Sequence, residues 1–94
     1  MVKHIVVYTF KENVDKAAAV KIVADALEPL VGKIPGLNVM QIRPCYQGGM
    51  DYCLYSEFDC KQSLADYSKH PLHLEAKQHF FHFIDKRVAA DFEV

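Results

Sequence analysis

Lys3-His4-Ile5-Val6-Val7-Tyr8-Thr9-Phe10 is the stretch of the chain from which its architecture can be worked out. Its side chains alternate as they do along a β-strand. One face carries His4, Val6, Tyr8 and Phe10, and the other carries Ile5, Val7 and Thr9. Both faces are largely apolar, and a strand of this kind is covered on both sides. We therefore predict helices against the His4 face and the sheet of a second subunit against the Ile5 face.

The next segment has the pattern of an amphipathic helix from Asn13 to about Lys33. Asn13 is a suitable N-cap, because its side-chain oxygen can accept a hydrogen bond from a free backbone N–H. Apolar residues recur at helical spacing as Val20, Val23, Leu27, Leu30, Val31 and Ile34. Pro29 removes an interior hydrogen bond, so we expect a kink or an irregular last turn there.

Two strands are predicted after this helix, over residues 37–45 and 51–59. The turn Gln47-Gly48-Gly49 joins them as a hairpin. Asp59 is then the predicted N-cap of a short helix, with Gln62 placed three residues on as in a capping box.

The dipeptide His70-Pro71 interrupts that short helix, because the residue before a proline is pushed out of the α conformation. We predict that His70 caps a second helix, which runs from Leu72 to about Ile84. Residues 86–94 alternate again and form the last predicted strand. The order βαββαβ predicts an α+β, ferredoxin-like fold in which helices cover one face of a four-stranded antiparallel sheet.

The bulk composition indicates one domain over residues 1–94 that pairs with a second copy of itself. The chain has 94 residues, of which 51% are hydrophobic, and a domain this small has little interior in which to bury them. The formal net charge of −1, from 11 basic and 12 acidic residues, argues against nucleic acid or an anionic membrane as a partner. We see no signal peptide and no transmembrane span, and we expect a cytoplasmic protein.

The three cysteines, Cys45, Cys53 and Cys60, are odd in number and lack a Cys-x-x-Cys spacing. A disulfide framework or a zinc knot is therefore not expected. We predict that all three are buried, inert thiols.

Four side chains form the best candidate site: His4, Tyr67, His70 and His73. Histidine suits proton transfer near neutral pH, because its ordinary pKa is about 6.5. Tyr67 and His73 flank the His70-Pro71 break, so they can converge on one end of the helix layer, and His4 faces that layer. A purely structural role remains open for each of them: a core aromatic for Tyr67, a helix cap for His70, and buried hydrogen-bonded histidines for His4 and His73.

A metal site is the second possibility, since Glu75, His79 and His82 share one face of the predicted helix. Lys77 would oppose a cation there, and the segment also fits an ordinary solvated helix face. We predict no metal and no cofactor, because the chain contains no P-loop, Gly-x-Gly-x-x-Gly, nucleophile elbow or His-Glu-x-x-His motif.

Three segments resemble the stress-responsive A/B barrel (Dabb) family. They are the opening strand Val2 to Val7 with Phe10-Lys11, the segment Asp66-Tyr67-Ser68-Lys69-His70-Pro71-Leu72-His73, and the closing Arg87 to Phe92. The second is similar to the family's Tyr-x-x-His-Pro-x-His core. The resemblance runs the length of the chain and implies a dimer in which two sheets pack face to face as an α/β barrel.

The resemblance also implies roles for three of the candidate residues. By similarity to the plant polyketide cyclases of this family, His73 would abstract a proton next to a carbonyl. Tyr67 would orient His73 or hydrogen-bond the carbonyl oxygen, and His4 would line the pocket. The hypothesis is a dimer with a small-molecule pocket and cofactor-free, cyclase-like chemistry. Two alternatives stay open: a non-catalytic ligand-binding or stress-associated protein, and a cofactor-free monooxygenase.

Overall fold

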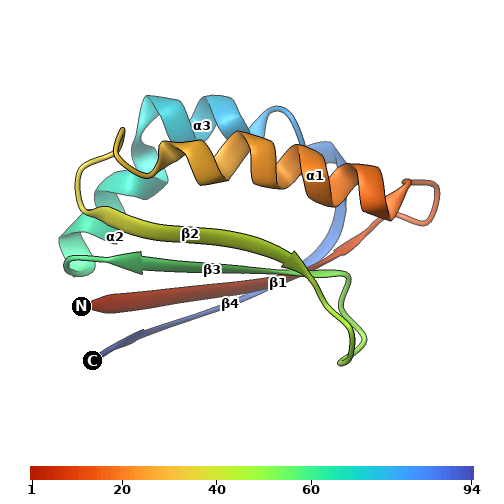
Figure 1. Ribbon diagram of the computed structural model, residues 1–94, viewed down its shortest axis with the longest axis horizontal. Helices are drawn as coiled ribbons and strands as arrows, with labels where there is room; N and C mark the ends of the chain where they lie inside the picture. The colour runs from red at the N-terminus through yellow and green to blue at the C-terminus, as the bar shows by residue number, and fades with distance from the viewer.

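The computed structural model describes residues 1–94 and contains one four-stranded antiparallel sheet. In chain order its elements are β1 (Val2–Phe10), α1 (Lys16–Leu27), the 3₁₀-helix η1 (Glu28–Leu30), β2 (Leu37–Pro44), β3 (Tyr52–Phe58), α2 (Lys61–Lys69), α3 (Pro71–Lys77), the 3₁₀-helix η2 (Phe81–Phe83) and β4 (Ile84–Glu93). The strands lie in the order β2-β3-β1-β4, and the three α-helices lie on one side of them (Figure 1). This is the predicted ferredoxin-like fold.

The His4 face of β1 lies beneath the helices (Figure 1), as predicted. Alternate residues from Val2 to Phe10 are buried beneath the helices, whereas Ile5, Val7 and Thr9 are only half-buried. The first set joins the apolar core, in which Val6 has 0% of its surface exposed. No helix lies against the opposite face of the sheet (Figure 1), so the intermediate exposure of Ile5 and Val7 comes from neighbouring strands alone.

Helix α1 is shorter at both ends than the sequence pattern indicated. Its N-cap is Asp15 and not Asn13: the Asp15 carboxylate accepts a hydrogen bond from the backbone N–H of Ala18 at 3.2 Å. A negative charge also interacts favourably with the positive end of the helix dipole, which favours Asp15 over the neutral Asn13. The irregular last turn predicted at Pro29 is present as the 3₁₀-helix η1. The change of helix type leaves Val31 39% exposed, outside the apolar stripe.

The entry to α2 corrects a second predicted cap. Asp59 does not cap this helix, because its carboxylate accepts a hydrogen bond from the Asn38 side chain at 2.8 Å. Cys60 occupies the N-cap position without a side-chain hydrogen bond to the helix backbone. Cys60 is exposed and Cys45 and Cys53 are only half-buried, so the prediction of three buried thiols is wrong.

The break at His70-Pro71 follows the prediction, but the next helix ends early. His70 caps α3 through its Nδ1, which accepts a hydrogen bond from the N–H of Leu72 at 3.1 Å, and Pro71 starts the helix. Helix α3 ends at Lys77 instead of near Ile84. Phe80 leaves the helical region with φ −142°, and this turn places its side chain in the core with 3% exposed. Burial of one large aromatic ring therefore outweighs the local helical pattern.

Gly36 allows the chain to pass closely beside α2. Its φ is +84°, and a Cβ atom added there would lie 2.4 Å from the Ser63 Oγ. Gly32 has a similar φ of +87° but open space around it, so it is a matched control. We expect Gly36→Ala to lower the free energy of unfolding by roughly 2–4 kcal/mol, and Gly32→Ala by only the backbone strain of roughly 1–2 kcal/mol. Urea denaturation of both variants measures the difference, and equal losses would show that the contact with Ser63 is unimportant.

The helix-free side of the sheet is a mainly apolar surface with a small polar group on it. We call it the open face. Its apolar residues include Ile5, Val7, Val39, Val88, Ala90 and Phe92. Val88 and Phe92 are 61% and 47% exposed. Lys3, Tyr55 and Glu57 form the polar group: Tyr55 donates to the Glu57 carboxylate, and the Lys3 ammonium lies 5.7 Å from the centre of the Tyr55 ring.

None of the helices has both the length and the apolar character that crossing a membrane would require.

Candidate functional site

Tyr67 and His73 come from consecutive helices and meet across the helix break. Tyr67 lies in α2 with 3% of its surface exposed, and His73 lies half-buried in the first turn of α3. Because His70 and Pro71 turn the chain between the two helices, the rings approach to 4.1 Å between centroids, tilted by 36°. The predicted convergence of these two side chains is therefore present in the structure.

The imidazole of His73 has an unusual environment for a histidine. Its Nδ1 is shielded from solvent and has no hydrogen-bond partner. The pKa of His73 is lowered to about 4, mainly because the ring is buried; the Ser68 backbone opposes this shift, and the nearby charges of Lys77, His4 and Arg87 add to it. At neutral pH the ring is uncharged, so it has a nitrogen lone pair that can accept a proton.

His4 is held in place by a residue of the edge strand. It lies on the helix-facing side of β1 with 9% of its surface exposed, directly opposite Asp91 of β4. The Asp91 carboxylate accepts a hydrogen bond from His4 Nδ1 in a short contact. This contact fixes the orientation of the ring and leaves Nε2 as the nitrogen that can face a ligand.

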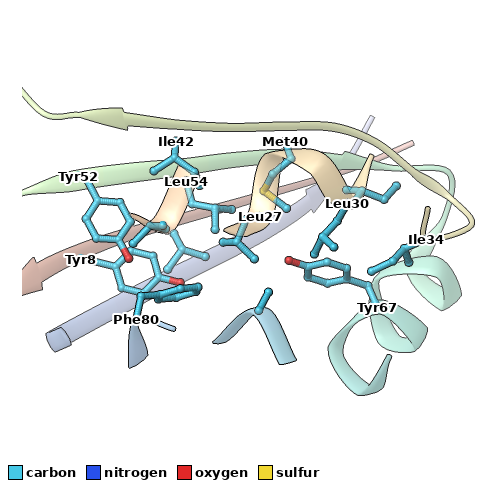
Figure 2. Packing of buried hydrophobic residues seen from close by; sticks show 14 of the residues in the cluster. Tyr8, Leu27, Leu30, Ile34, Met40, Ile42, Tyr52, Leu54, Tyr67 and Phe80 are labelled. Carbon is cyan, nitrogen blue, oxygen red and sulfur yellow. The ribbon is translucent and has the colours of Figure 1, made fainter. Parts of the chain in front are cut away.

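A row of aromatic rings connects His4 with the other two predicted site residues. The Phe58 ring lies 6.4 Å from His4 and 5.1 Å from Tyr67, and Tyr67 in turn touches His73. All four rings therefore lie on the helix-facing side of the sheet. In Figure 2 the Tyr67 hydroxyl points along the core, toward the end occupied by Tyr8, Tyr52 and Phe80. Burial raises the pKa of Tyr67, so its hydroxyl stays protonated and can donate a hydrogen bond.

The edge strand next to these residues is not covered by the helices. The helix-facing side of β4 carries Arg87, Ala89, Asp91 and Glu93, which we call the β4 edge, and all four are exposed. A cavity of about 430 Å³ lies at one end of it, lined by Val2, Lys61, Leu64, Asp91, Phe92 and Glu93. None of the five cavities of the isolated chain is lined by His4, Tyr67 or His73.

The sequence reasoning did not identify Asp91 and Arg87 as site residues. Both alternate with apolar residues along β4, and a surface role explains such charges equally well. The signal that could have found them is strand register: once β1 and β4 are paired, His4 lies opposite Asp91 and Tyr8 lies opposite Arg87. That register depends on a contact between the two ends of the chain and cannot be read from local pattern.

The residues considered for a metal site do not form one cluster. Glu75 and His79 line a cavity beside α1, whereas His82 lines another together with Lys11. No three His, Cys, Asp or Glu side chains lie close enough together to hold a metal ion.

Solved structures with the same fold come from several organisms. A Bacteroides fragilis protein, described as dimeric, ferredoxin-like and of unknown function, is 28% identical with a TM-score of 0.88, over 99% of this chain and 95% of that one. An Arabidopsis thaliana protein is 23% identical with a TM-score of 0.86, over 100% and 95% of the two chains. A Nitrosomonas europaea protein, provisionally described as an antibiotic biosynthesis monooxygenase, is 17% identical with a TM-score of 0.80, over 100% and 98%. At such low identities the last two similarities establish the fold alone.

No curated protein is similar enough to count as a match. The family model for the Stress responsive A/B Barrel Domain, however, matches residues 2–94. This match covers nearly the whole chain, including the strand with His4 and the helices with Tyr67 and His73. The chain therefore belongs to the stress-responsive A/B barrel (Dabb) family.

Proposed function

We propose that this protein is a homodimer that binds a small carbonyl compound at the β4 edge and transfers a proton without a cofactor. His73 is the base that removes a proton from the carbon next to the carbonyl. Tyr67 donates a hydrogen bond to the carbonyl oxygen, and His4, oriented by Asp91, lines the site. The reaction class is enolisation, and an intramolecular ring closure of the cyclase type is one outcome of it.

The observation that carries this proposal is the unpartnered Nδ1 of His73. A buried polar atom without a hydrogen bond destabilises the folded chain by about 1–3 kcal/mol, so such atoms are few in folded proteins and a catalytic role is one explanation for them. Contact with the protonated Tyr67 places a hydrogen-bond donor beside a neutral base. Since Nδ1 is shielded in the isolated chain, a substrate would have to displace neighbouring side chains to supply the partner that it lacks.

In the proposed step the C–H bond next to the carbonyl breaks, and its proton moves to the neutral imidazole of His73. The electron pair of that bond forms the carbon–carbon double bond of an enolate. The negative charge that develops on oxygen is stabilised by the Tyr67 hydroxyl. Return of a proton from the imidazolium to carbon completes an exchange, and attack of the enolate carbon on a second carbonyl would close a ring.

The open face supports the homodimer. Its apolar residues include Val88 and Phe92, which are 61% and 47% exposed in the isolated chain, and a second copy would remove them from water. The similar Bacteroides fragilis protein is described as dimeric. The three cysteines are unpaired, which supports a reducing compartment such as the cytoplasm.

Deuterium exchange tests the proposed chemistry directly. We expect the protein to accelerate exchange of the protons next to the carbonyl of 4-phenyl-2-butanone in D₂O. The exchange is measured by ¹H NMR, and the control is buffer that contains an equal concentration of lysozyme. Exchange no faster than in that control would contradict the enolisation proposal. Consumption of oxygen with hydroquinone, without exchange, would support the monooxygenase alternative instead.

A further inference from the structure

Arg87 is a cation without a carboxylate partner at the proposed site. It is exposed on the β4 edge, opposite Tyr8 of β1. The chain has two arginines, and the other one, Arg43, pairs with Glu28 at 3.1 Å. No Asp or Glu oxygen lies within 4.0 Å of Arg87. Its guanidinium instead lies 6.0 Å from the centre of the Tyr8 ring.

Two buried phenols lie beside Arg87. Tyr8 and Tyr52 stack with ring centroids 4.5 Å apart and 10° between the ring planes. Tyr52 is 0% exposed, and its hydroxyl has no hydrogen-bond partner. In Figure 2 both residues lie at one end of the core together with Phe80. Burial raises the pKa of both phenols, so both hydroxyls are protonated donors at neutral pH.

Arg87 also acts electrostatically on the proposed base. Its charge opposes the rise in the pKa of Tyr8 and Tyr52 that burial causes, and it adds to the lowering of the pKa of His73. The side chains around this guanidinium therefore include hydrogen-bond donors, and no carboxylate is paired with it. Such a set favours an acceptor that carries negative charge, because charge-assisted hydrogen bonds are stronger than neutral ones.

We propose that Arg87, with the hydroxyls of Tyr8 and Tyr52, binds the carboxylate of an oxo acid whose carbonyl group lies at Tyr67 and His73. This inference rests on the proposed function and specifies its substrate class. One guanidinium matches one carboxylate in charge and in its planar, two-pronged geometry. A phosphate dianion would call for further cations or a cradle of backbone N–H groups, which these three residues do not supply.

The carboxylate would also affect the base. Pairing Arg87 with a negative charge cancels one of the charges that lower the pKa of His73. A bound oxo acid would therefore raise that pKa in the direction that makes a general base more effective, while burial, the main cause of its low value, stays in place. A neutral ketone would leave Arg87 unpaired and His73 a weaker base.

Binding of a matched pair of probes tests this assignment. We would titrate ¹⁵N-labelled protein with 4-oxo-4-phenylbutanoate and, separately, with its methyl ester, following amide shifts by NMR. We expect the acid to bind at least tenfold more tightly than the ester. Arg87→Gln should remove that tenfold preference by weakening acid binding alone, and Arg43→Gln is the control that should preserve it.

Tyr52→Phe supplies a second readout. Because the hydroxyl is buried without a partner, its removal should raise the melting temperature of the free protein and at the same time weaken acid binding at least threefold. An unchanged affinity for the acid would show that Tyr52 is only part of the core.

The outcomes separate this inference from the chemistry on which it rests. Equal affinities for acid and ester, no binding of either, or an Arg87→Gln variant that keeps the preference would each overturn the carboxylate site. If the carboxylate site is disproved but the protein still accelerates deuterium exchange of 4-phenyl-2-butanone, the proposed enolisation is still supported. If the acid binds in an Arg87-dependent way but no deuterium exchange is accelerated, the enolisation proposal is wrong and the protein is one that only binds the acid.

Discussion

Replacing His73 with glutamine is expected to slow deuterium exchange by at least about 100-fold, the usual contribution of a positioned general base. Glutamine is close to histidine in size and polarity, so it keeps much of the packing against Tyr67 and removes the basic nitrogen. His79→Gln is the matched control, because His79 is exposed and lies beyond the end of α3. The His79→Gln variant should accelerate deuterium exchange of the ketone as much as the wild-type protein does.

The pH dependence of the same variant distinguishes a base from a packing residue. Wild-type exchange should fall as the pH drops through about 4, because protonation of His73 removes the lone pair. The unfolded chain binds the proton near the ordinary pKa of about 6.5, so wild-type stability should also decline from there down to about pH 4. His73→Gln should lose this portion of the pH dependence. A folded variant that retains full exchange would show that His73 is not the base.

The fold followed from local pattern because each element has a clear signal. The alternation in β1, the proline at Pro29 and the break at His70-Pro71 each have a direct physical consequence for the backbone, and each is present in the structure. Errors occurred where a partner distant in the sequence competes with a local one. Asp59 could cap α2 by its position, but the distant Asn38 takes its carboxylate.

The candidate site was predictable only in part, for a related reason. Tyr67 and His73 are six residues apart, and the intervening break brings them together, so a local pattern was sufficient. Asp91 meets His4 across 87 positions of sequence through strand register, and the alternation in β4 does not reveal that register. Likewise, the absence of a hydrogen-bond partner for His73 Nδ1 depends on how the whole helix layer packs, which no local pattern shows.

Introducing a charge on the open face is expected to separate the proposed dimer without unfolding the chain. Val88 is 61% exposed in the isolated chain, so Val88→Asp leaves the monomer core intact. In a symmetric dimer the substitution places two carboxylates in an apolar interface, and each unpaired buried charge costs several kcal/mol. The dissociation constant should therefore rise at least about 1,000-fold, equivalent to about 4 kcal/mol.

Sedimentation velocity across a range of concentrations measures this change, and circular dichroism checks that the variant is folded. Val31→Asp is the matched control: it is the same substitution at a residue 39% exposed, in the turn after η1 and away from the open face. A Val88→Asp protein that stays dimeric with wild-type affinity would show that two copies do not meet through this face. A folded Val88→Asp monomer that still exchanges deuterium would show that one subunit holds all the chemistry, since His4, Tyr67 and His73 belong to the helix-facing side of the same sheet.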